Sequence, residues 1–245
     1  MSSKEVSLLS ISFKQYYYKL KAHTGLLNRL LLTQILALLF SLIGGTSSMG
    51  TSSGQLSVTV RSYSANMVIV FSILWVIIVA VLLTTKPYKQ LERPLVGNRL
   101  TGNLSDVGFL MTACVFAGVT SSLGGVLLRN VMYFISDRST MALDGFFLTF
   151  TDLMFGMVVA ILVLVLVSAM GYLVGVLVQA NKVLAILIPV VIMGALRVYT
   201  HLEQFVLEFY FVNASLPWFA LKVIITSITL FGVSIMISDR MEVNQ

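Results

Sequence analysis

One segment of this 245-residue sequence matches a catalytic pattern. The run Gly50-Thr51-Ser52-Ser53-Gly54 fits Gly-x-Ser-x-Gly, the sharp turn that presents a nucleophilic serine for acyl transfer. That chemistry needs a strand before the serine, a helix after it and a histidine base. The run lies instead in a stretch rich in serine and glycine between two apolar segments, so we interpret it as part of a surface loop.

The other residue types that carry chemistry are few and scattered. Neither His23 nor His201 has a cysteine or carboxylate at the spacing of zinc ligands on a helix, and Cys114 is the single cysteine. A site of several cysteines and an internal disulfide are therefore excluded. The sequence also lacks the Gly-x-x-x-x-Gly-Lys-Ser/Thr loop that cradles nucleotide phosphates. We expect a protein that is not an enzyme and holds no metal and no cofactor of its own.

The composition places this chain in a lipid environment. Apolar residues make up 58% of it and charged residues 11%, against roughly 45 to 50% and about 25% in ordinary soluble domains. A soluble domain of this size needs far more ionisable surface. We therefore predict an all-α integral membrane protein that forms a single domain over residues 1–245.

Six apolar runs are candidates for spans, because a bilayer core of about 30 Å takes roughly 20 helical residues. They are 30–45, 65–83, 107–128, 153–180, 183–196 and 217–237. The fifth is short and contains Pro189, which removes a backbone hydrogen bond and should kink the helix. Lys222 interrupts the sixth at a depth that suits a lysine reaching for the interface. We predict six transmembrane helices, with the fifth the weakest.

The distribution of basic residues orients the chain. Eleven of them fall on one side of the predicted spans, namely Lys4, Lys14, Lys19, Lys21, Arg29, Lys86, Lys89, Arg93, Arg99, Lys182 and Arg240. Four fall on the other, namely Arg61, Arg129, Arg138 and Arg197. Since basic residues accumulate in cytoplasmic loops, both termini should be cytoplasmic and the protein should lie in the cell membrane. The same asymmetry explains the net charge of +6 without a nucleic-acid partner.

Two segments outside the spans have helical patterns. In the cytoplasmic tail 1–29, which is too long and polar for an ordinary signal peptide, residues 8–20 predict an interfacial amphipathic helix. Its apolar residues are Leu9, Phe13, Tyr16, Tyr17 and Leu20, with Lys14, Lys19 and Lys21 around them. A plain basic tail is the alternative. Residues 202–210 predict a short outer-surface helix before the sixth span, or a piece of a broken fifth helix.

The cytoplasmic loop 86–104 carries both signs of charge and an aromatic residue. We predict a short helix between Pro87 and Pro94 that docks a partner, although a plain basic loop would have the same composition. Its candidate contact residues are Lys86, Tyr88, Lys89, Glu92, Arg93 and Arg99. At its end, Asn103, Ser105 and Asp106 lie where we expect the next helix to begin, so Asp106 is interpreted as a helix cap.

Small and polar residues inside the predicted spans indicate packing and a pathway. Small residues recur every four positions at Ala113, Ala117, Ser121 and Gly125, and again at Gly171 and Gly175. Such ridges let helices approach closely, within the chain or between subunits. Gln34 and Asn66 are among the few polar residues in the spans, with Trp75 and Met193 as apolar candidates for a lining. So little charge suits a hydrophobic or amphipathic cargo better than an inorganic ion.

The order of these features resembles the permease subunits of type-2 ABC exporters. The resemblance covers a basic amphipathic N-terminal helix, six spans, a basic loop ending in Asn98-Arg99-Leu100-Thr101-Gly102-Asn103-Leu104-Ser105 and a surface segment before the last span. It implies that residues 86–100 and 8–20 contact a separate ATPase subunit, which binds ATP and Mg. It also implies a second permease, identical or related, with helices two and five along the seam.

The candidates for the pathway lining are Gln34, as a polar residue inside the first span, and, by this resemblance, Asn66, Trp75, Met193 and Arg197. The expected function is export of a peptide, antibiotic or lipid, driven by the partner ATPase. A non-transporting membrane assembly or scaffold protein is the main alternative, and a secondary carrier driven by an ion gradient is a third.

Overall fold

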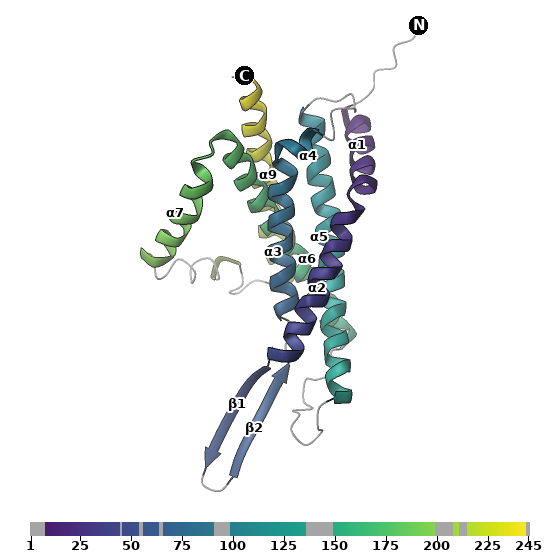
Figure 1. Ribbon diagram of the computed structural model, residues 1–245, viewed down its shortest axis with the longest axis vertical. Helices are drawn as coiled ribbons and strands as arrows, with labels where there is room; N and C mark the ends of the chain where they lie inside the picture. The colour runs from purple at the N-terminus through teal and green to yellow at the C-terminus, as the bar shows by residue number, and fades with distance from the viewer. Residues whose placement is uncertain are drawn as a thin grey trace. The chain divides into compact units, whose positions relative to one another are not determined.

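The computed structural model describes residues 8–44, 46–53, 56–63, 66–90, 99–135, 149–198, 208–210 and 215–243. Its helices are α1 (Leu8–Ala22), α2 (Thr24–Gly44), α3 (Asn66–Thr84), α4 (Lys86–Gln90), α5 (Arg99–Ile135), α6 (Phe150–Ala180), α7 (Leu184–Val198) and α9 (Leu216–Val243), shown in Figure 1. Its strands are β1 (Thr46–Ser53) and β2 (Leu56–Tyr63).

Five of these helices, α2, α3, α5, α6 and α9, are long and apolar enough to cross a membrane. All five keep large apolar side chains on their outer surfaces. On α2, for example, the exposed residues include Leu32, Ile35 and Leu39. Lipid solvates such side chains at no cost, whereas water would not. The prediction of a multi-pass, helical membrane protein is therefore confirmed at this level. Six spans and the orientation stay predictions.

The predicted fifth span forms a helix of 15 residues, α7, which contains Pro189. It is shorter than each of the five candidate spans and too short by length alone to qualify as one. Figure 1 shows α7 following α6 and slanting away from α9, and Ile186 and Val190 of α7 are 74% and 61% exposed.

The third predicted span begins earlier than expected. α5 starts at Arg99 and runs for 37 residues, so Asp106 lies about two turns inside the helix. The interpretation of Asp106 as a helix cap is therefore wrong. Both polar side chains are buried and hydrogen-bonded inside the protein. The helix can therefore continue through Asn103 and Asp106 although neither residue is apolar.

A two-stranded antiparallel hairpin occupies the predicted loop between the first two spans. β1 pairs with β2 from Thr46↔Tyr63 to Ser53↔Leu56. This element was not included in the all-α prediction. Ser52 of the Gly-x-Ser-x-Gly match lies within β1, paired with Ser57, and the next element is another strand. A nucleophile turn needs a helix there, so the catalytic interpretation is not supported.

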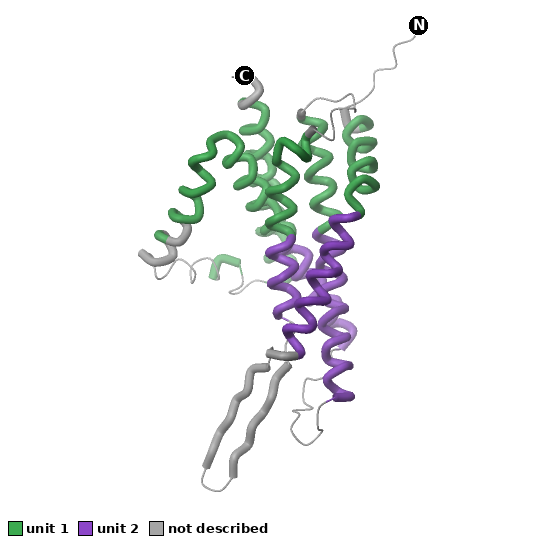
Figure 2. Tube along the Cα trace, in the orientation of Figure 1, with its two compact units in different colours: residues 1–24, 76–113, 165–245 green, residues 25–75, 114–164 purple. Residues whose placement is uncertain are grey.

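The chain groups into two compact units, coloured in Figure 2. The first unit comprises residues 1–24, 76–113 and 165–245, and the second comprises residues 25–75 and 114–164. In the second unit, Gln34 is buried, and its Nε2 donates to Ser72 Oγ at 3.0 Å and to the Ala117 carbonyl at 3.3 Å. Ala117 and Ser121 are also buried, as expected for a ridge of small residues used in packing.

In the first unit, glycines bring α6 against α3. A Cβ atom at Gly171 would lie 3.1 Å from Ala80 Cβ. One at Gly175 would lie 2.5 Å from Thr84 Oγ1 and 3.1 Å from Val81 Cα. Gly171 and Gly175, the second set of small residues noted in the sequence, therefore pack against α3 of the same chain.

We expect Gly175→Ala to lower the free energy of unfolding by about 1 to 3 kcal/mol, because the added methyl would collide with the Thr84 side chain and crowd the Val81 backbone. The matched control is Gly156→Ala on the same helix, where a Cβ meets nothing within 4 Å. That variant should be neutral or slightly stabilising. Denaturant titration of the purified protein in detergent measures both. Equal effects of the two variants would contradict the close packing.

Candidate functional site

The short helix predicted in the cytoplasmic loop is present as α4, Lys86–Gln90. Pro87 lies in its first turn, where the missing N–H leaves no bond unmade. Lys86 is exposed, whereas Tyr88 and Lys89 are half-buried. Of the other candidate contact residues, Glu92 and Arg93 lie outside the described residues. Arg99 is the first residue of α5, and its side chain is not among those described.

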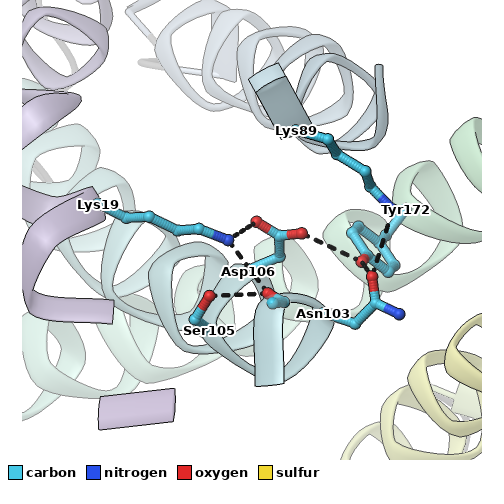
Figure 3. Close-up of polar contacts among 7 residues, drawn as sticks. Lys19, Lys89, Asn103, Ser105, Asp106 and Tyr172 are labelled. Atoms are coloured by element: carbon cyan, nitrogen blue, oxygen red, sulfur yellow. Dashed lines mark hydrogen bonds and ion pairs between the residues drawn. The ribbon is translucent and has the colours of Figure 1, made fainter. Parts of the chain in front are cut away.

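Lys19 of α1 is a buried cation. Its side chain is 1% exposed, and Nζ lies 2.5 Å from Asp106 Oδ1 of α5. Nζ also donates to the Gly102 carbonyl at 3.1 Å, as Figure 3 shows. The sequence placed Lys19 among the charges around an interfacial helix, but the structure places it inside the protein. An isolated ammonium would not be stable there, so the Asp106 carboxylate is required.

Two further side chains join this pair. The Tyr172 hydroxyl of α6 lies 3.2 Å from Asn103 Oδ1 and 3.4 Å from Asp106 Oδ2, so its single proton can be donated to either oxygen. Lys89 Nζ of α4 donates to Asn103 Oδ1 at 3.3 Å. We call Lys19, Lys89, Asn103, Asp106 and Tyr172 the polar network. It joins α1, α4, α5 and α6 within the first unit (Figure 3).

His23 adds an aromatic contact beside the polar network. Its ring lies 5.4 Å from that of Tyr88 on α4 and 5.9 Å, edge-on, from that of Phe109 on α5, measured between centroids. Burial lowers the pKa of His23 below its ordinary value of 6.5. The charge of Lys19 lowers it further, and the Asp106 carboxylate opposes both effects. The packed ring is therefore held neutral.

A lowered pKa in the folded state means that the unfolded chain takes up the His23 proton first as the pH falls. The stability from neutral His23 is complete above about pH 6.5 and is lost as the pH drops through the lowered folded value. We expect His23→Phe to flatten this part of the stability curve. Thermal unfolding of both proteins between about pH 5 and 7.5 tests this. Parallel curves would contradict it.

The predicted pathway residues have different surroundings. Gln34 is buried with protein partners, Trp75 is 6% exposed, and Asn66 is an exposed residue at the start of α3. Met193 and Arg197 belong to α7, but their side chains are not among those described. A shared lining role for these five stays a prediction.

The segment before the last helix contacts α9. Residues 208–210 are helical, and 199–207 lie outside the described residues. Lys222 Nζ of α9 donates to the Phe209 carbonyl at 2.5 Å and lies 4.8 Å from the centroid of the Phe209 ring. The Tyr210 hydroxyl lies 3.3 Å from Thr226 Oγ1. Lys222 therefore binds the preceding segment, a contact that its predicted depth did not reveal.

Comparisons with protein-family models, curated proteins and solved structures find no match for this chain. Lys19, Asn103 and Tyr172 were not among the sequence-derived site residues. The nearest signal in the sequence was the carboxylate of Asp106 beside an apolar run, but a helix cap explained that carboxylate equally well.

Proposed function

We propose that this chain is the membrane permease of an ATP-driven exporter in the cell membrane. In this proposal the chain has six spans, α7 being the fifth, and both termini are cytoplasmic. A separate ATPase subunit binds ATP and Mg and hydrolyses the nucleotide. The cargo is hydrophobic or amphipathic, such as a peptide, an antibiotic or a lipid, because the spanning helices offer few charged groups for an ion.

The observation that supports the proposal is the attachment of α4 to the polar network. A permease without a phosphate-binding loop has to be driven by contact with the subunit that hydrolyses ATP. A movement of α4 caused by the ATPase subunit then has to be transmitted to the spanning helices. The Lys89–Asn103 bond leads from α4 to α5, and Tyr172 and Lys19 extend the connection to α6 and α1. Asn103 and Asp106 lie one turn apart on α5, so they move together.

The second permease would face the exposed side of α3. Met67, Val70, Leu74 and Ile78 form one exposed stripe on this helix, whereas Val68, Ser72 and Val76 are buried. In a Cys114→Ser background, we expect single cysteines on the stripe to crosslink two copies and cysteines at the buried positions not to do so. Monomers at every position would rule out a seam along α3.

The scaffold alternative makes the small residues a docking surface for other proteins. Gly171 and Gly175 argue against it, because α3 already occupies the space beside them. A carrier driven by an ion gradient needs a buried group that can bind the ion and is not already paired within the protein. Asp106 lies near the end of a candidate span, but its carboxylate is paired with Lys19.

The decisive test replaces residues 87–100 with a Gly/Ser linker of equal length. We expect the tagged full-length chain to copurify with a polypeptide that carries a nucleotide phosphate-binding loop and hydrolyses ATP, and the linker variant to lose it. The matched control replaces residues 47–62 of the hairpin in the same way, because that segment is predicted to lie on the opposite side of the membrane. It should retain the ATPase.

Thermal unfolding of both linker variants separates loss of a partner from loss of the fold. Tyr88→Ala provides a second, smaller change in α4 that should weaken coupling to the ATPase without removing the loop. An unaltered ratio of ATPase to permease after replacement of 87–100 would overturn the proposal.

A further inference from the structure

α1 is amphipathic in the opposite sense to a helix on a soluble protein. Ser12, Gln15 and Lys19 follow one another at intervals of three and four residues, and all three are buried. The other side of the helix exposes its aromatic residues, with Phe13 at 69%, Tyr17 at 63% and Tyr18 at 47%. A helix in water would bury the aromatic side.

The polar side faces α5. Lys19 bonds to Gly102 and Asp106 there, and a Cβ at Gly108 would lie 3.2 Å from the Tyr16 ring. Figure 1 shows α1 beside the start of α5. The buried ion pair therefore fixes the rotation of α1 about its own axis, and this rotation determines that the aromatic side points outward.

Chain continuity places the C-terminal end of this exposed side close to a candidate span. Only His23 separates the end of α1 at Ala22 from the candidate span that begins at Thr24. At about 1.5 Å per helical residue, Tyr17 and Tyr18 lie within roughly 10 Å of that start along the chain. Tyrosines are enriched at this depth, where the ring contacts lipid and the hydroxyl reaches water.

The charge of this side of α1 indicates which kind of surface it would bind. Residues 8–44 contain four basic residues, Lys14, Lys19, Lys21 and Arg29, and neither aspartate nor glutamate. Asp106 neutralises Lys19, whereas Lys14 and Lys21 are exposed on α1 beside the aromatic residues. Exposed lysines attract an anionic lipid surface, and their stems can lie along apolar surface while the charge stays in water.

We propose that the exposed side of α1, made of Phe13, Lys14, Tyr17, Tyr18 and Lys21, binds anionic lipid at the membrane surface. Lipid fits better than a protein partner, because lysine is depleted from the cores of protein interfaces and enriched beside aromatic residues at membrane interfaces. The proposal concerns the chain alone and does not depend on the ATPase.

Native mass spectrometry of the full chain, released from nanodiscs of phosphatidylcholine with phosphatidylglycerol, tests the charge. We expect Lys14→Gln/Lys21→Gln to reduce retained phosphatidylglycerol about tenfold relative to phosphatidylcholine. Lys14→Arg/Lys21→Arg should restore it. Lys182→Gln is the matched control, because Lys182 is another exposed lysine predicted to be cytoplasmic. An equal loss with Lys182→Gln would overturn the proposal.

Spin labels on single cysteines in the Cys114→Ser chain test the aromatic side. Labels at positions 13 and 17 should be relaxed more strongly by lipid-soluble oxygen than by a water-soluble nickel chelate. A label at Lys4, in the tail that is predicted to be cytoplasmic, is the aqueous reference. Stronger relaxation by nickel at 13 and 17 would place this side in water. Protection that arises only after a protein partner is added would assign the side to that partner. Either result would overturn lipid binding.

Discussion

Replacement of Lys19 with methionine should lower the free energy of unfolding by about 3 to 5 kcal/mol. The substitution leaves the Asp106 carboxylate 1% exposed and without its cation, and removal of one member of a buried pair is far more costly than removal of both. Denaturant titration in detergent measures the change. Hydrogen exchange along α1 should show that protection is lost there first, because Lys19 holds that helix against α5.

The double variant Lys19→Met/Asp106→Leu should recover most of this loss, because it removes both charges from the interior. Lys14→Met is the matched control on the same helix. Lys14 is exposed, so this change should stay within about 0.5 kcal/mol. A double variant as unstable as Lys19→Met, or a Lys14→Met variant equally destabilised, would show that the pair does not hold α1.

The positions of the spanning helices were predictable because an uncharged apolar run reports directly on lipid contact. α3 begins and ends within one residue of its predicted bounds of 65–83, and α6 ends at the predicted Ala180. The start of α5 was not predictable in this way. The sequence is less apolar before residue 107, so the apolar run does not extend to the true start of the helix. The residues between contain buried polar side chains, and their composition does not distinguish a helix from a loop.

The centre of the candidate site could not be found from local sequence. Lys19 and Asp106 are 87 positions apart, and each alone has an ordinary explanation, a basic tail for one and a helix cap for the other. Only the tertiary arrangement shows that they neutralise each other. Tyr172 is similar, since an aromatic residue in an apolar run gives no sign that its hydroxyl has a partner.

The hairpin, in contrast, had a local signal that was overlooked. Leu56, Val58 and Val60 alternate with Ser57, Thr59 and Arg61, which is the two-residue period of a strand. The serine-rich β1 has no comparable pattern. β1 forms a strand because its backbone pairs with that of β2, although the side chains of β1 give no strand pattern.

Tyr88→Ala should impair coupling to the ATPase more than Lys89→Ala does, if α4 receives the push as proposed. The Tyr88 ring is half-buried and packs on His23, at the junction of α1 and α2, so its loss disconnects α4 from that junction. The bond from Lys89 to Asn103 is 3.3 Å long and starts from a partly solvated position, where such contacts are worth about 1 kcal/mol or less. We expect stimulated ATP hydrolysis and transport in proteoliposomes to fall about tenfold for Tyr88→Ala and about two- to threefold for Lys89→Ala, consistent with that difference in contact energy.

Tyr88→Phe is the matched control, because it keeps the ring that packs on His23 and removes only the hydroxyl. It should retain most of the activity. If Tyr88→Phe were as impaired as Tyr88→Ala, the hydroxyl and not the ring packing would be required, and contact with His23 would not transmit the push. If Tyr88→Ala and Lys89→Ala gave equal transport and equal ATPase stimulation, the route through the aromatic contact would have no advantage over the polar one.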